Sequence, residues 1–107
     1  MTFEEACIHV WQASLIDGAR AVIVGDTPFP VSASAKQKLR QVHFVIDGRE
    51  FRGIEQNPLT KSRWAAMARS GKKVMQFVEG RRYVAVVVDG KFIPYKAVRE
   101  GSEDGDL

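Results

Sequence analysis

The fold is constrained more by residues 73–95 than by any other part of the chain. Their sequence is KVMQFVEGRRYVAVVVDGKFIPY. The middle segment, residues 83–88, is apolar at successive positions and so on both sides of a strand. A strand with one wet face alternates apolar and polar residues, and this segment does not. We therefore predict a strand whose two faces are both covered by other elements or by a second subunit.

Two tight turns set the predicted pairing within this run. Asp89-Gly90 is a preferred dipeptide of two-residue hairpins and pairs residues 86–88 with residues 91–93. Gly80-Arg81 is the expected preceding turn, which sets Phe77 opposite Val84 and Met75 opposite Val86. One face of this predicted meander holds Met75, Phe77, Val84, Val86, Val88, Ile93 and Tyr95. The other holds Val74, Val78, Tyr83, Ala85, Val87 and Phe92, interrupted by Gln76. Pro94 lacks the N–H of a ladder and predicts that residues 91–95 form an edge strand.

Residues 39–46 and 49–56 predict a second hairpin, with Asp47-Gly48 as its turn. Counting back from that turn sets Phe44 opposite Phe51 on the face that we expect to be buried. The same register places His43 on the wet face. It also predicts an ion pair between Arg40 and Glu55.

The first helix is expected at residues 3–16. Thr2 and Glu5 fit a capping box at its start, and Asp17-Gly18 supplies a stop. Its apolar arc, which we expect to cover the sheet, comprises Phe3, Ala6, Cys7, Val10, Trp11, Ser14 and Leu15. A second, shorter helix is expected to follow Pro58, with Thr60 or Ser62 as its cap and Gly71 as its stop, on the face that the first helix leaves bare.

The remaining segments complete an α+β fold. Residues 21–24 predict a short strand, and residues 29–31 a second edge strand broken by proline. Residues 32–38 lack an apolar stripe and predict a loop or a ragged strand. We therefore predict a mostly antiparallel sheet of about six or seven short strands, curled enough for a partial barrel to be an alternative, with an N-terminal helix and one short inserted helix.

Length and composition predict one globular domain, residues 1–98, in a chain of 107 residues. Residues 99–107 are polar, acidic and glycine-containing and predict a disordered tail. Cys7 is the single cysteine, the start of the chain lacks a signal-type apolar stretch, and no apolar run approaches the roughly 20 residues that span a bilayer. The sequence therefore favours a cytoplasmic protein that does not bind membranes.

The net charge of +3 is unevenly distributed. Residues 1–35 hold one Arg against four acids, giving −3; residues 36–100 hold 15 basic against six acidic residues, giving +9; residues 101–107 hold three acids, giving −3. This basic body predicts, as one alternative, sequence-tolerant binding of nucleic acid or another polyanion, with Tyr83 or His43 as a stacking surface. The candidate polyanion contacts are Arg49, Arg69, Lys72, Lys73, Arg81 and Arg82. The acidic tail would compete with such a partner.

Polar side chains also concentrate where the strand at residues 49–56 ends and the second helix begins. The candidate binding patch there consists of Arg52, Glu55, Gln56, Asn57 and Arg63. A further alternative is an enzyme cleft near Glu55, Asn57 and His43. We favour the simpler interpretation, in which these three residues are structural, because no pattern indicates a partnered general base.

No phosphate loop, nucleophile triad or metal-ligand spacing occurs in the sequence, so we expect no cofactor and no metal. The sequence leans against an enzyme. It favours a small macromolecular-interaction domain whose partner is another protein or a second copy in a homodimer, ahead of nucleic acid. The case for a homodimer is that a second copy could cover an apolar face of the meander.

Overall fold

The computed structural model describes residues 1–95. Its elements are α1 (Phe3–Ser14), β1 (Ala21–Val24), β2 (Thr27–Ala33), β3 (Arg40–Ile46), β4 (Arg49–Glu55), α2 (Arg63–Arg69), β5 (Val74–Glu79), β6 (Arg82–Val88) and β7 (Lys91–Pro94). The predicted tail, residues 99–107, and residues 96–98 of the predicted domain lie outside the described residues. No helix in the described part of the chain is long and apolar enough to cross a bilayer.

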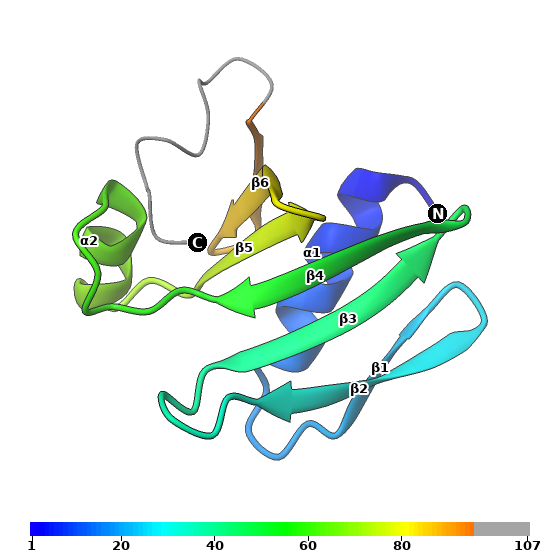
Figure 1. Cartoon of the computed structure of the whole chain (residues 1–107), viewed down its shortest axis with the longest axis horizontal. Helices are drawn as coiled ribbons and strands as arrows, with labels where there is room; N and C mark the ends of the chain where they lie inside the picture. The colour runs from blue at the N-terminus through cyan, green and yellow to red at the C-terminus, as the bar shows by residue number, and fades with distance from the viewer. Residues whose placement is uncertain (96–107) are drawn as a thin grey trace.

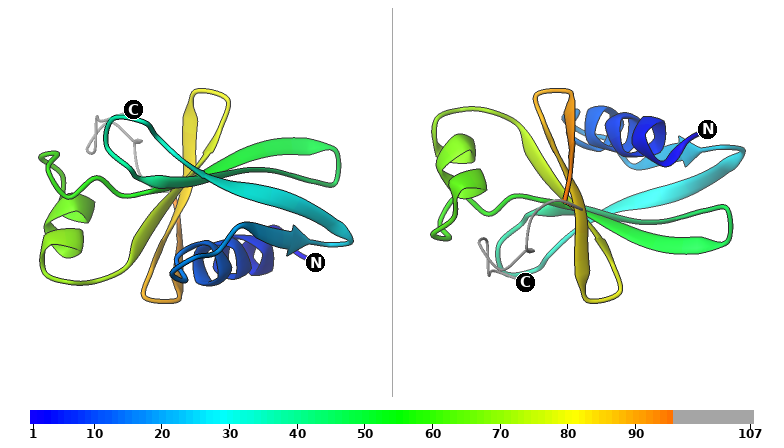
Figure 2. Two further views of the ribbon diagram at one scale, coloured as in Figure 1. Left: turned by 90° about the horizontal axis from the view of Figure 1, so that it is seen from below. Right: turned by 90° about the horizontal axis from the view of Figure 1, so that it is seen from above.

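The seven strands form one antiparallel sheet in chain order, with β1 and β7 as its edges in the described part of the chain. Figure 1 shows α2 at one end of this sheet, beyond β4 and β5. The sheet is strongly twisted, and the hairpin of β5 and β6 crosses the direction of β3 and β4 (Figure 2). The predicted α+β class and antiparallel sheet are confirmed, and the sheet is not closed.

Helix α1 covers one face of the sheet. Thr2 and Glu5 form the predicted capping box, and backbone and side-chain hydrogen bonds with Thr2 lower the pKa of Glu5. The helix ends at Ser14, two residues before the predicted end, with Leu15 as its C-cap. The buried core between this helix and the sheet includes Ala6, Cys7, Val10, Val42, Phe44, Phe51, Met75, Phe77, Ala85 and Val87. Burial raises the pKa of the Cys7 thiol, which therefore stays protonated at neutral pH.

Helix α2 covers part of the opposite face, as predicted. Ser62 is its N-cap and accepts from the backbone N–H of Ala65 at 3.0 Å. Its C-terminus closes with two backbone bonds, Gly71 N to Ala68 O and Lys72 N to Met67 O, both 3.1 Å. Trp64 of this helix forms a second cluster of buried residues with Val74, Val86 and Tyr95.

The predicted register of β5 and β6 is wrong beyond a β-bulge. Glu79 pairs with Arg82 as expected, but Phe77 pairs with Ala85 rather than Val84, and Met75 with Val87. The ring of Phe77 thereby lies between the small residues Gly53 and Ala85 on its neighbouring strands. A β-bulge inserts one extra residue, so the side chains beyond it exchange faces.

The two faces of the meander therefore carry different residues from those predicted. Ala85 and Val87 pack into the core under α1, and Val84 lies partly buried beside them. Val86 and Val88 pack on the side of α2, together with Ile93 and Tyr95. Apolar side chains on both faces of the meander therefore pack against other parts of the same chain, as predicted, and Val88 and Ile93 remain partly exposed.

Strand β2 is not an edge strand as predicted, because it lies between β1 and β3. Val31 N donates to Arg20 O at 2.8 Å, so the alternating residues Pro28 and Pro30 turn their nitrogens toward β3. Neither nitrogen carries a hydrogen, and β2 pairs with β3 only from Val31 to Ala33. The predicted edge position of β7, with Pro94, is confirmed.

One carbonyl joins α1 to the last hairpin. The Lys73 carbonyl oxygen accepts from Trp11 Nε1 at 2.9 Å and from Asp89 N at 3.0 Å. In return, Lys73 N donates to the Asp89 carboxylate at 2.8 Å. These bonds fix the start of β5 against both the helix and the Asp89-Gly90 turn.

Candidate functional site

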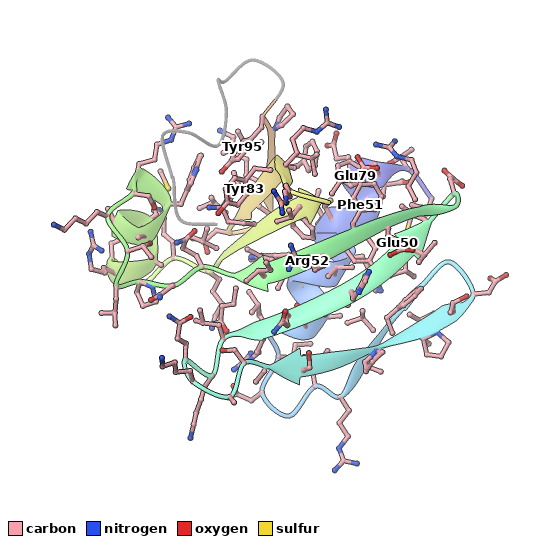
Figure 3. All side chains as sticks on the ribbon, viewed as in Figure 1. Glu50, Phe51, Arg52, Glu79, Tyr83 and Tyr95 are labelled. Carbon is pink, nitrogen blue, oxygen red and sulfur yellow. The ribbon has the colours of Figure 1, made fainter. Side chains whose placement is uncertain are left out.

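A hollow of about 310 Å³ opens on the face of the sheet opposite α1, beside the loop that joins β4 to α2. Arg52 and Ile54 line it because they alternate along β4 with Phe51 and Gly53, which face the core. Arg52 and Tyr83 lie near each other above the sheet in Figure 3. We call this hollow the amide pocket. Its lining is Gln37, Leu39, Arg52, Ile54, Glu55, Gln56, Asn57, Thr60, Gln76 and Tyr83.

The floor of the amide pocket is a chain of buried hydrogen bonds. The Tyr95 hydroxyl donates to Gln76 Oε1, and Gln76 Nε2 donates to Gln56 Oε1 at 2.8 Å. Gln56 Nε2 then donates to Asn57 O at 3.0 Å and to Thr60 Oγ1 at 3.1 Å. Gln56, Gln76 and Tyr95 are each 4 % exposed, so these bonds lie in a low-dielectric environment that strengthens them.

The loop between β4 and α2 holds its shape through its own hydrogen bonds. Asn57 Oδ1 accepts from Leu59 N at 2.9 Å, the side-chain pattern of an Asx turn. The guanidinium of Arg69 donates to the carbonyl oxygens of Pro58 at 2.6 Å and Thr60 at 3.0 Å. The wall of the pocket is thus tied to the helix that follows it.

The predicted Arg40–Glu55 ion pair does not form. Glu55 Oε1 accepts from the backbone N–H of Arg40 at 3.0 Å, while the Arg40 guanidinium lies 3.4 Å from Asp17. The main chain of β3 thus satisfies Glu55, and the side chain of Arg40 contacts Asp17 in the segment after α1 instead. Arg52 makes one long contact, Nη2 to Gly80 O at 3.5 Å.

A second hollow, of about 410 Å³, adjoins the amide pocket and shares Gln37, Leu39, Glu55 and Gln56 with it. Lys38 lines one side of it, and Lys72 and Lys73 line another. Glu55 is the one acidic residue in its lining. We call it the lysine hollow, since its positive charge distinguishes it from the amide pocket.

The structure brings together four of the five residues of the candidate patch. Arg52, Glu55, Gln56 and Asn57 line the amide pocket, whereas Arg63 does not and lies 4.3 Å from the ring of Trp64. His43, from the enzyme alternative, lines neither hollow. Its Nε2 lies 3.2 Å from Glu50 on the exposed surface of the sheet.

The six candidate polyanion contacts divide into two groups. Lys72 and Lys73 line the lysine hollow. Arg69 lies near them at the end of α2, but its guanidinium donates to carbonyl oxygens of the loop between β4 and α2. The others, Arg49, Arg81 and Arg82, belong to the β4–β5–β6 end of the sheet. Arg49 lies 2.7 Å from Glu79 and Arg82 lies 3.5 Å from it. The hydrogen bond from Arg49 lowers the pKa of the Glu79 carboxyl.

Comparison with family models, curated proteins and solved structures found no match. Among residues 1–95, no group of three or more His, Cys, Asp or Glu side chains is placed to hold a metal ion.

Sequence reasoning missed part of this site. It did not include Gln37, Lys38, Leu39 and Thr60, which reach the hollows only through the fold. Tyr83 was expected as a stacking surface, and it lines the amide pocket. Gln76 carried a usable signal, because a single amide that interrupts an apolar strand face needs a polar partner in the folded chain.

Proposed function

We propose that the protein is a small macromolecular-interaction domain that binds single-stranded nucleic acid across the lysine hollow and the amide pocket. Two basic segments meet at the lysine hollow, and this observation carries the proposal. Residues 34–39 and 57–73 contain no Asp or Glu. Their basic residues are Lys36, Lys38, Lys61, Arg63, Arg69, Lys72 and Lys73. A concave surface on which one sign of charge predominates concentrates partners of the opposite charge.

The amide pocket supports a single strand as the form of the partner. Tyr83 offers an aromatic face and Arg52 a planar guanidinium, and unpaired bases stack on both kinds of group. Phosphates would lie over the three lysines of the adjoining hollow. Bases in a double helix are already stacked and could not enter, so a duplex would use the lysines alone.

The other partners considered for this chain have less support. The homodimer alternative requires an uncovered face of the meander, whereas α1 packs on one face and α2 on part of the other. The alternative of an enzyme cleft requires His43 beside Glu55 and Asn57, but His43 lies outside both hollows and contacts Glu50. An acidic protein segment would meet the lysines but has no evident use for the stacking wall.

Fluorescence anisotropy with a labelled single strand of about 12 nucleotides tests the proposal. We expect binding at low salt that weakens with a log–log salt slope of about −2, since three lysines contribute about 0.7 each. The triple variant Lys38→Gln, Lys72→Gln, Lys73→Gln should abolish this slope.

A matched control removes the same charge elsewhere, through Arg20→Gln, Arg81→Gln and Lys91→Gln, and should leave most of the binding. No binding at low salt, or equal losses from the two triple variants, would overturn the proposal. Poly-glutamate competing as well as the single strand would instead identify an acidic protein as the partner.

A further inference from the structure

We propose that the amide pocket is a subsite for one unpaired nucleobase with a lactam edge, such as uracil or guanine. A lactam edge presents a C=O acceptor next to a ring N–H donor. This inference rests on the proposed binding of single strands and adds a preference for the base.

The side-chain amide of Gln76 holds a buried hydrogen-bond donor without a partner. Gln76 lines the pocket and is 4 % exposed, and one N–H of its amide donates to Gln56 Oε1. The other N–H of that amide has no hydrogen-bond partner among residues 1–95. Buried donors are almost always satisfied, so an unmatched one that lines a hollow indicates the place of a ligand acceptor.

The amide of Gln76 cannot turn over to give this N–H a partner. Gln56 Nε2 donates to the Asn57 carbonyl oxygen, so Gln56 Oε1 faces Gln76 and the Gln76 atom that meets it must be the amide nitrogen. Gln76 Oε1 then accepts from the Tyr95 hydroxyl. Gln56 cannot turn either, because its Nε2 donates to both Asn57 O and Thr60 Oγ1. The open N–H therefore stays a donor at the floor of the pocket.

The other polar groups of the amide pocket determine which edge of a base is complementary to it. Further donors come from Arg52, whose guanidinium makes a single long contact, and from Asn57, whose Oδ1 is already occupied by Leu59 N. The acceptor is Glu55, because Arg40 N occupies only its Oε1. A carbonyl toward the donors and a ring N–H toward the carboxylate match a lactam edge. Cytosine and adenine lack this ring N–H, so in the same position their N3 or N1 acceptor would face the Glu55 carboxylate.

Uridine and adenosine homopolymers of equal length separate this inference from the lysine-dependent binding. At one salt concentration we expect the uridine strand to bind about tenfold or more tightly. Glu55→Gln keeps an oxygen for Arg40 N but replaces the free acceptor by a donor, and it should bring that ratio close to one. Glu50→Gln removes the same charge outside the hollow and should leave the ratio unchanged.

Free uridine and cytidine, which carry no phosphate, probe the pocket independently of the lysines. Uridine at millimolar concentration should shift the side-chain NH2 resonances of Gln76 in a ¹⁵N spectrum, and cytidine should shift them far less. The signals are assigned by their loss in Gln76→Leu. If strands bind through the lysines with no base preference and uridine leaves Gln76 unshifted, the base subsite is wrong and the proposed function stands. If uridine shifts the Gln76 resonances but no strand binds, the base subsite stands and the proposed binding of single strands is wrong.

Discussion

A Cβ atom on Gly53 would lie 2.9 Å from Cε1 of Phe77, so the phenyl ring fills the space that any other residue at position 53 needs. Gly53→Ala should therefore destabilise the protein by about 1–3 kcal/mol through overpacking, measured by urea denaturation. Phe77→Leu removes the edge of the ring. In that background Gly53→Ala should destabilise less, and a purely additive pair would contradict the proposed contact.

The two Asp-Gly turns should respond differently to the same substitution. Asp47 and Asp89 both have positive φ, 51° and 48°, but the Asp89 carboxylate also accepts from Lys73 N. Asp47→Ala should destabilise by about 1 kcal/mol through backbone strain, and Asp89→Ala by about 2 kcal/mol because a hydrogen bond is also lost. Asparagine at either position should be close to neutral. Equal effects of the two alanines in thermal denaturation would argue against the role of the Asp89 side chain.

The Arg49–Glu79 pair should make stability depend on pH. Its hydrogen bond lowers the pKa of Glu79 in the folded chain, so its contribution is present above the unfolded pKa of about 4.3 and is lost as pH falls through the folded pKa. The melting temperature of the wild type should exceed that of Glu79→Gln at neutral pH, and the gap should close on acidification. Arg49→Gln should remove the same dependence, and salt should weaken it because both groups are near the surface.

The acidic end of the chain should oppose nucleic-acid binding. Deleting residues 101–107 removes three acids and raises the net charge from +3 to +6. We expect single strands to bind about fivefold more tightly at low salt, with the gain lost at high salt. A full-length variant with Ser in place of Glu103, Asp104 and Asp106 should behave like the deletion. An effect of the deletion alone would point to length rather than charge.

The register of the hairpin of β3 and β4 was predictable from its turn and its pattern, although the ion pair expected between Arg40 and Glu55 does not form. Asp47-Gly48 allows a two-residue turn, and the register that follows sets Phe44 opposite Phe51, as observed. Pairing and burial agree at each position of the two strands, so no tertiary contact had reason to change the register.

The register of β5 and β6 was predictable only next to its turn. Gly80-Arg81 sets Glu79 opposite Arg82, but the bulge follows within three residues. The cause lies in other strands: the ring of Phe77 packs between Gly53 and Ala85, and neither neighbour is identified by the local sequence. Tertiary packing thus overrides a locally consistent pairing.

The candidate site also has a part that the sequence predicts and a part that only the strand order brings together. Glu55, Gln56 and Asn57 are consecutive, so their proximity required only that the strand end there. Gln76 and Tyr83 reach the pocket because β5 pairs with β4 and β6 pairs with β5, an order that periodicity does not determine. Arg63 is one residue from the N-cap of α2, and its contact with Trp64 draws it away from the pocket.

The hydrogen bond from Trp11 to Lys73 spans 62 positions of the chain. During synthesis, α1 leaves the ribosome long before the carbonyl that anchors it and before Met75 and Phe77, which fill the core beneath it. A helix this short is marginal alone, so its apolar stripe would remain open to chaperones until the last hairpin has been made. Folding of this domain should therefore wait until residues 73–95 have been synthesised.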